Sequence, residues 1–424
     1  MKNNRNGTVL AGNDLLPGDI VKFRAVEAAF LERCRQFGYR EIKTSTIEPL
    51  HIFTAAGALS PALLKKVCSF LDWGGWSRER VALRADSTIS AARYYLDNLT
   101  EEGHVKVCYI ENQFRRGDTG QEVSERWQLG IENIGDDSPV SDVEVIFIAV
   151  DTLRAAGFDR TCLHLSFPSI IIEYVNLTFG EPEERQKVLG LIKEGRHEDI
   201  KSLGGNDRDT DILFRLLRFR GENVSYLNNL RSDFYNHGKI LRHLERFREI
   251  CVLLERLKCP YEINFSLSGN FDYYTGIQFE VLSSSRKTSD REVLCTGGRY
   301  DNLIGSLAPR GAKAVPSVGF ALNLKNAISL MQEPVDTMQN IGIMLRNITY
   351  DNIKTGQNLC LRLNRLGFIS RLSFSEIAEE EYGDYGLIIE VDRERFRDGY
   401  SIIHSRKIGK PLLKNIFGES SHDA

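Results

Sequence analysis

The chain has 424 residues, of which 42% are hydrophobic and 27% are charged. This balance is typical of a globular protein with a large buried core, and it excludes an intrinsically disordered chain. The 55 Lys and Arg residues nearly cancel the 58 Asp and Glu residues, and the net charge of −3 excludes general binding of polyanions, though not a local basic groove.

The sequence contains no sign of membrane insertion, secretion or metal binding. No apolar run approaches the ~18 residues that a membrane helix needs, and residues 1–7 lack the apolar segment of a secretory signal. The eight cysteines form no CxxC pair, and the eight histidines show no HExxH or HxH spacing. We therefore expect reduced thiols, no metal site and a cytoplasmic location.

The first hundred residues predict two helices and a strand. Apolar residues recur at helical spacing over residues 20–37, and Gly38 ends that pattern. Residues 39–47 alternate like a strand, and residues 88–98 form a second, shorter helical pattern.

A long-looped antiparallel hairpin follows. Residues 105–114 and 126–134 both alternate like strands, and the loop at 115–121 between them is polar and contains glycine.

The middle of the chain predicts a helical insertion between strands. A helix is expected over 141–156, and the charged stretch 176–258 contains a clear helical stripe but no strand pattern of comparable quality. Strand patterns return afterwards, at 261–267, 271–282 and 292–298, and a strand–helix pair occupies 316–331.

The last 85 or so residues begin like a separate small α/β domain. Residues 332–336 look like a linker, and a strand at 341–345, a helix at 351–366 and a strand at 368–372 follow. We therefore expect four segments: two parts of one core at 1–175 and 259–333, a helical insertion at 176–258, and a C-terminal domain at 334–424.

The second strand of the hairpin carries polar residues that could bind a small ligand. Alternation places Gln128, Gly130 and Glu132 on one face, and the glycine between the two polar side chains leaves room above the sheet. Glu132 could hold a cation such as an amino group, and Gln128 could orient it. The alternative is a polar stripe that simply faces solvent.

Residues near the start of the hairpin loop and of the helix at 88–98 could complete such a site. Arg115 and Arg116 suit a phosphate or carboxylate ligand. The alternative is that both side chains are simply solvated at the end of the loop. Asp86 or Ser87 could merely cap the helix, or Asp86 and Thr88 could lie at the edge of the same pocket.

Two further motifs are weaker signals. Tyr273 and Tyr274 are adjacent, a pattern more typical of a core or interface than of ligand contacts. Gly297 and Gly298 follow a strand and permit close approach of a ligand or of backbone. No Walker P-loop, GxGxxG or GxSxG motif is present.

Taken in order over residues 14–331, these segments resemble the catalytic core of the histidyl-tRNA synthetase family, which belongs to the class II aminoacyl-tRNA synthetases. The resemblance rests on six short motifs in the right order and spacing: 16–19, 38–42, 114–116 with 128–132, 272–276, 297–301 and 317–324.

The resemblance implies a fold and a set of roles. The fold would be α+β, a six- or seven-stranded antiparallel sheet flanked by helices, with a helical insertion, a small C-terminal α/β domain and a two-fold dimer interface at 14–49. Arg115 falls on the arginine that contacts the α-phosphate of ATP. The histidine-binding positions fall on Asp86 (where the family usually has Glu), Thr88, Gln128, Glu132, Tyr273 and Tyr274.

Two departures from the synthetase pattern remove cations. Gly269 occupies the position of an arginine that neutralises charge in the family as the amino acid is activated. Asn326 occupies the position of a second arginine, which lies against the ATP γ-phosphate in the family. Lys325 is the residue before that position. Since losing one such donor costs roughly 10²–10³ in rate, losing both would remove useful aminoacylation. The tail is also shorter than the anticodon-binding domain of the family.

A synthetase-like core with these losses resembles the regulatory subunits of ATP phosphoribosyltransferase. That resemblance implies a chain without catalytic residues or cofactor, in which Arg115 is a vestigial phosphate contact. It would act with a short-form catalytic subunit at the first step of histidine biosynthesis, with histidine as effector.

The same resemblance implies a homodimer within a hetero-oligomer, with no membrane partner and no tRNA binding. The main alternative is a divergent, working histidine–tRNA ligase in which Lys325 or Arg299 replaces the lost cations. Another paralogue, such as a different amino-acid-dependent ligase or a nucleic-acid accessory subunit, is a third alternative.

Overall fold

The computed structural model of the chain describes residues 14–55, 59, 61–71, 80–117, 123–203, 207–267, 274–283, 291–308, 313–331, 340–366 and 368–405. The chain divides into two compact units, Met1–Gln332 and Glu333–Ala424.

A mixed sheet runs through the first unit, with nine strands among the described residues in the order β1-β5-β6-β12-β11-β10-β7-β9-β8. The strands are β1 Arg40–Glu41, β5 Val105–Arg116, β6 Val123–Ile134, β7 Thr161–Ser166, β8 Arg220–Gly221, β9 Glu262–Asn264, β10 Gln278–Ser283, β11 Val293–Arg299 and β12 Ser317–Asn323. Every pair from β5 to β7 is antiparallel, whereas β1 joins β5 and β9 joins β7 in parallel.

The predicted antiparallel centre is therefore confirmed, but the predicted width of six or seven strands is wrong. The sheet is wider because very short strands extend its edges. β8 has two residues and lies in the stretch predicted to be purely helical. A strand of that length is too short for alternation to identify it in a sequence.

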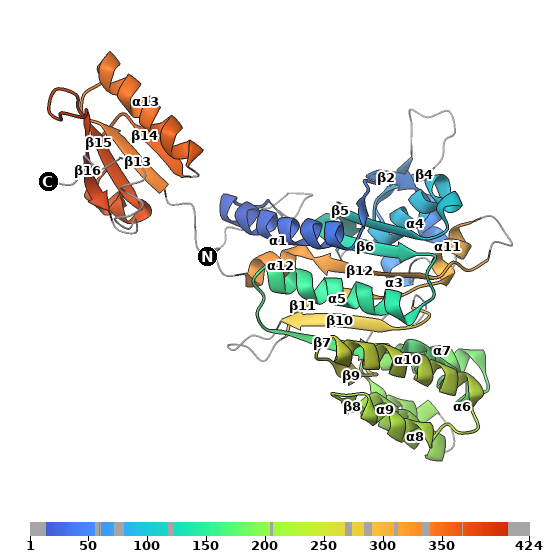
Figure 1. Cartoon of the computed structure of the whole chain (residues 1–424). Coiled ribbons are helices and arrows are strands. Elements are labelled where there is room, and N and C mark those ends of the chain that lie inside the picture. Colours follow the sequence, from blue (N-terminus) through green and yellow to red (C-terminus); the bar gives the residue numbers. More distant parts are fainter. Residues whose placement is uncertain are drawn as a thin grey trace. The chain divides into compact units, whose positions relative to one another are not determined.

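Helices α1 (Pro17–Gln36), α5 (Pro139–Ala155) and α12 (Leu324–Leu330) cover one face of this sheet (Figure 1). α1 buries Phe23, Val26, Phe30 and Cys34, which recur at helical spacing, and Gly38 follows its end at a φ of +76°. These side chains join Leu129, Ile131 and Phe320 of the sheet in the main hydrophobic core. The opposite face of the sheet consequently carries Gln128, Gly130 and Glu132.

A second, smaller core lies on that opposite face. It contains residues of α4 (Ser87–Asn98), α11 (Asn302–Leu307) and α2 (Leu50–Thr54). The short helix α3 (Pro61–Leu64) and a small sheet in the order β2-β4-β3 belong to the same part of the chain, and Ala82 of that sheet joins the core. The strands of that sheet are β2 Ile47–Pro49, β3 Ser69–Leu71 and β4 Arg80–Leu83. α4 and α11 leave part of the polar face uncovered, and the pocket described below lies there.

Helices dominate the segment between β7 and β9, as the sequence predicts. They are α6 Pro168–Thr178, α7 Pro182–Lys193, α8 Asp207–Arg218, α9 Ser225–Arg231 and α10 Gly238–Arg256, and they lie beside the end of the sheet formed by β7, β9 and β8 (Figure 1). α10 carries the stripe seen in the sequence, with Leu244, Phe247, Cys251 and Leu254 buried.

The second unit has an α/β architecture, and its described residues form a four-stranded sheet and one long helix. Its strands lie in the order β14-β13-β15-β16, with β13 Asn340–Leu345, β14 Ile369–Ser373, β15 Leu387–Val391 and β16 Tyr400–Ser405. β13, helix α13 (Tyr350–Arg365) and β14 form the predicted strand–helix–strand start, and β13 and β14 are parallel.

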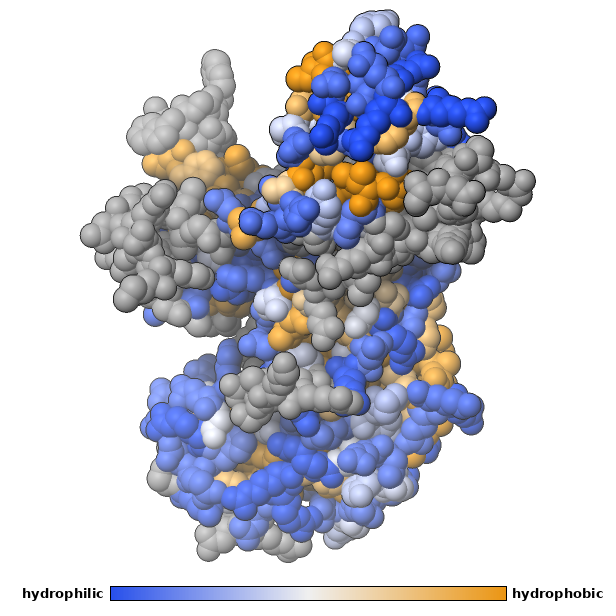
Figure 2. Space-filling view, turned by 90° about the vertical axis from the view of Figure 1, so that its left-hand side faces the viewer, coloured by the Kyte–Doolittle hydropathy of each residue, from blue (hydrophilic) through white to orange (hydrophobic). Residues whose placement is uncertain are grey.

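Hydrophilic residues predominate on the face drawn in Figure 2, and apolar residues form separate smaller patches there. Among the described residues, none of the helices combines the length and the hydropathy of a membrane span.

α1 and the residue before it expose three large apolar side chains, Leu16, Ile20 and Val21.

Candidate functional site

A pocket of about 330 Å³ opens on the polar face of the first unit's sheet. This volume lies at the lower end of the ~300–1,000 Å³ range of small-molecule sites. Its lining includes Arg115 and four of the six residues predicted to bind histidine: Asp86, Thr88, Gln128 and Tyr274.

Asp86 both caps a helix and faces the pocket, so the two alternatives for this residue are not exclusive. One carboxylate oxygen, Oδ1, accepts from the backbone N–H groups of Thr88 (3.0 Å) and Ile89 (3.3 Å) at the start of α4. The other, Oδ2, lies 3.4 Å from Nη2 of Arg115. A carboxylate has enough acceptor sites to serve both purposes.

Arg115, at the end of β5, is held against the pocket wall. Its Nε donates to the carbonyl oxygen of Ala85 at 2.8 Å, and its Nη2 donates to Gln113 Oε1 at 3.4 Å as well as to Asp86. Burial lowers the pKa of Arg115, and the neighbouring Asp86 opposes that shift. The guanidinium stays charged because its ordinary pKa lies far above neutrality.

Gln128 is anchored by a second carboxamide that the sequence analysis missed. Gln113 Nε2 donates to Gln128 Oε1 and, at 3.3 Å, to Ser87 Oγ. Gln113 also lines the pocket. Alternation along β5 places Gln113 on the same face as Arg115, and that spacing could have identified it.

Glu132 lies beneath the pocket rather than in its lining. It is 1% exposed and accepts hydrogen bonds from the hydroxyl groups of Tyr109 (3.0 Å) and Tyr300. Burial raises the pKa of Glu132 to about 8, although hydrogen bonds from Tyr300, Thr88 and Tyr109 oppose the shift. At neutral pH this carboxyl therefore holds its proton.

The space above Gly130 is filled by a side chain, not left open for a ligand as the sequence suggested. A Cβ atom on Gly130 would lie 2.4 Å from the ring of Tyr109. Tyr109 is fully buried, and its hydroxyl lies 3.3 Å from Thr88 Oγ1. The glycine is needed because an aromatic ring crosses the strand there, and the sequence contains no signal for which ring would do so.

The glycine pair at the end of β11 has a similar explanation. A Cβ atom on Gly298 would lie 2.4 Å from the carbonyl oxygen of Ile277 and 2.7 Å from the ring of Tyr274, which is half-buried and lines the pocket. Burial raises the pKa of Tyr274, so its hydroxyl is neutral. Tyr273 and Gly269 lie outside the described residues, so their predicted roles stay predictions.

Asn326, on α12, lines the pocket as an uncharged residue. Its side-chain amide donates to the carbonyl oxygen of Val293 at 2.9 Å. Among the lining residues that the structure describes, the cations are Arg115 and Arg126, and Arg126 is not one of the residues predicted from the sequence.

Arg299 is engaged in a buried ion-pair network. It is 4% exposed, and its guanidinium donates to Asp142 Oδ1 (2.8 Å), Ser141 Oγ (2.9 Å) and Asp301 Oδ1 (3.2 Å). These contacts tie β11 to the start of α5. Arg299 is therefore committed to packing and does not line the pocket.

The sequence is similar to two groups of known proteins. The histidyl-tRNA synthetase family model matches residues 12–327. Two proteins from strains of Dehalococcoides mccartyi, each named ATP phosphoribosyltransferase regulatory subunit, are 34% identical to this chain over 377 residues, 88% of this chain and 88% of each relative. The chain belongs to the family of ATP phosphoribosyltransferase regulatory subunits.

Relatives named histidine–tRNA ligase match this chain at lower sequence identity. The histidine–tRNA ligase of Methanocaldococcus jannaschii is 31% identical over 319 residues, 73% of this chain and 71% of the relative.

Solved structures confirm the predicted α+β, synthetase-like fold. A Bacillus halodurans protein described as an ATP phosphoribosyltransferase regulatory subunit/histidyl-tRNA synthetase has a TM-score of 0.74 at 21% identity, covering 92% of this chain and 99% of that one. Histidyl-tRNA synthetase from a Nostoc species has the same TM-score at 15% identity, covering 98% and 99%. At these identities the likeness concerns the fold alone.

Proposed function

We propose that this chain is a non-catalytic regulatory subunit of ATP phosphoribosyltransferase. It would be required for the first step of histidine biosynthesis and for its feedback regulation by histidine. The observation that carries this proposal is the 34% identity to proteins of that name over 88% of both chains.

Histidine would bind in the pocket on the polar face. Asp86 offers a carboxylate oxygen for the ammonium group of an amino acid, and Thr88, Gln128 and Tyr274 surround the same space with neutral polar groups. Glu132 would act from beneath, where it orders Tyr109 and Tyr300, and Tyr273 completes the proposed set.

The absence of aminoacylation is part of the proposal, and the pocket supports it. Adenylate formation needs positioned cations around the phosphates. Asn326 is neutral, and its amide bonds to the backbone of β11. Arg299, one of the two cations that the ligase alternative could use, is bound to Asp142. Arg115 would remain as a vestigial phosphate contact.

The name of the relatives implies a catalytic-subunit partner, and we propose that this partner is the short form of that subunit. The chain would pair with a second copy through residues 14–49, and the exposed Leu16, Ile20 and Val21 support such an interface because each would lose apolar surface to a partner. No cofactor and no tRNA take part in this proposal.

Histidine-dependent ATP–pyrophosphate exchange separates the regulatory subunit from the ligase. We expect no exchange from the purified chain, while histidine still raises its melting temperature. We also expect the chain to make a short-form catalytic subunit sensitive to histidine. Exchange at a synthetase-like rate would refute the proposal in favour of the divergent ligase.

The variant Asp86→Asn tests the pocket within the same assay. It keeps an oxygen for capping α4 but removes the charge that would hold the ammonium group. We expect it to abolish the histidine-induced shift while lowering the melting temperature without histidine only slightly, through loss of the ion pair with Arg115. Glu101→Gln, a charge removal at an exposed site, is the matched control.

A further inference from the structure

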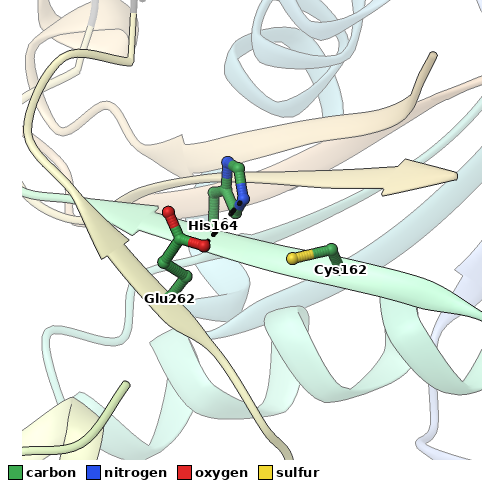
Figure 3. A group of neighbouring side chains, drawn as sticks. All are labelled: Cys162, His164 and Glu262. Carbon is green, nitrogen blue, oxygen red and sulfur yellow. Dashed lines mark ion pairs between the residues drawn. The ribbon is translucent and has the colours of Figure 1, made fainter. Parts of the chain in front are cut away.

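Three side chains of different chemistry converge at the β7–β9 edge of the main sheet. Cys162 and His164 come from β7, and Glu262 comes from β9 (Figure 3). One potential ligand atom from each, the sulfur, a ring nitrogen and a carboxylate oxygen, lies within 4.8 Å of the other two. His164 is buried, and the other two are half-buried.

Strand geometry explains why these residues meet. Cys162 and His164 are two positions apart on one strand, so their side chains lie on the same face. His164 and Glu262 are direct neighbours in the parallel pairing of β7 with β9. His164 Nε2 lies 3.7 Å from Glu262 Oε2, and Figure 3 shows the two side chains turned toward one another.

The cluster lies on the same face of the sheet as the pocket but apart from it. Direct strand partners share a face, and His164 is paired with Glu280 of β10, which is paired with Thr296 of β11, a pocket-lining residue. The cluster therefore lies two strands away from the pocket wall. None of its three residues lines the pocket.

A cationic side chain already occupies the space between two of these atoms. Nη1 of Arg291 lies 3.8 Å from Cys162 Sγ and 3.4 Å from His164 Nε2. A guanidinium can only donate hydrogen bonds, so Nε2 presents its lone pair to this space. Arg291 is exposed and can therefore turn away. Nε of Arg220 lies 3.7 Å from Glu262 Oε1, and Nη2 of the same guanidinium donates to Ser266 Oγ at 2.8 Å.

We propose that Cys162, His164 and Glu262 form a binding site for Zn²⁺ or a similar divalent transition metal, with Arg291 as the group that the metal displaces. Sulfur, imidazole nitrogen and carboxylate oxygen are the donors that zinc prefers, and three of them leave a fourth tetrahedral position for water. Tetrahedral ligands around zinc lie on the order of 3.5 Å apart, so no pair of these atoms would need to approach by more than about 1 Å. Binding releases the thiol proton of Cys162 to solvent.

Such an ion would tie together two parts of the first unit. β7 is a strand of the antiparallel sheet, whereas β9 is the strand to which the chain returns after the helices α6 to α10. Because the ion would bind the folded chain and not the unfolded one, it would stabilise this junction.

The test is a titration of the full-length, untagged, chelator-treated chain with Zn²⁺, and with Co²⁺ as a spectroscopic probe. We expect one equivalent to bind, with a thiolate-to-cobalt charge-transfer band. Cys162→Ser and Glu262→Gln each alter a direct ligand. Each should weaken metal binding at least as much as the loss of a residue that only supports a ligand, which costs roughly 10–100-fold. Arg291→Ala should bind more tightly, because it removes the competing cation.

Cys360→Ser is the matched control, since Cys360 is the other half-buried cysteine and lies on α13 in the second unit. It should bind the metal like the unmodified chain. Equal binding by Cys162→Ser and Cys360→Ser, or a cobalt spectrum without a thiolate band, would overturn the proposal. Melting temperatures measured in chelator show whether each variant folds, and a Zn²⁺-induced rise in the unmodified chain but not in Cys162→Ser would support it.

Discussion

The buried carboxyl of Glu132 should make the stability of the first unit fall as the pH rises. Burial raises the pKa of Glu132 from its ordinary value of 4.5 to about 8. The folded chain then binds more protons than the unfolded chain between about pH 4.5 and pH 8, so the free energy of unfolding decreases across that window.

The size of this effect follows from the shift in pKa. Each unit of pKa difference corresponds to ~1.4 kcal/mol, and allowing for partial titration at both ends leaves roughly 3–4 kcal/mol lost between about pH 5 and pH 8. Other groups titrate over the same range. The informative quantity is therefore the difference between the unmodified chain and Glu132→Gln, which keeps the shape but has no proton to lose.

Tryptophan fluorescence during urea unfolding is a suitable assay. All three tryptophans, Trp73, Trp76 and Trp127, precede residue 332, so the signal reports on the first unit. We expect the stability of the unmodified chain to fall relative to Glu132→Gln by those 3–4 kcal/mol as the pH rises.

The control variant Glu101→Gln removes an exposed carboxylate, and its stability should follow the unmodified chain at every pH. Stability curves for the unmodified chain and Glu132→Gln that run parallel, within about 1 kcal/mol, would show that Glu132 is ionised in the folded chain and would refute the reasoning.

Three further variants test the packing around the pocket. Asp86→Ala removes both the helix cap and the charge, so it should lower stability by about 0.5–2 kcal/mol and abolish the histidine-induced thermal shift, whereas an unchanged shift would exclude Asp86 as a ligand. Gly130→Ala forces a methyl group into the ring of Tyr109 and should cost about 1–3 kcal/mol in urea unfolding; no loss would mean that the ring moves aside freely. Arg299→Ala leaves the buried Asp142 with Arg246 as its one remaining cation partner among the described residues, and calorimetry should find a loss of about 3–5 kcal/mol at neutral pH, shrinking at low pH as that carboxyl takes up a proton.

Much of the fold follows from local patterns in the sequence. α1 and α10 were predictable because their apolar residues repeat at helical spacing, and the hairpin of β5 and β6 because its strands alternate over many residues. The resemblance to the histidyl-tRNA synthetase family was recognisable from the order of six short motifs, and the comparisons confirm it. The division into segments at 175, 258 and 333 stays a prediction.

The tertiary structure decided what surrounds each predicted site residue. Alternation places Gln128 and Glu132 on one face, but it does not show that Tyr109 crosses Gly130 or that Tyr300 reaches the same carboxyl. Tyr109 belongs to β5, and Tyr300 directly follows β11. Their hydroxyl groups reach Glu132 only in the folded sheet. For this reason Glu132 was expected in the pocket wall and lies beneath it.

The cluster of Cys162, His164 and Glu262 shows the same limit more sharply. The sequence suggested no metal site, because motif spacing detects only ligands that are close together along the chain. Glu262 is separated from His164 by five helices and reaches it through the pairing of two strands. Local periodicity depends on neighbouring residues and is legible in the sequence, whereas strand pairing across a long insertion depends on the whole fold.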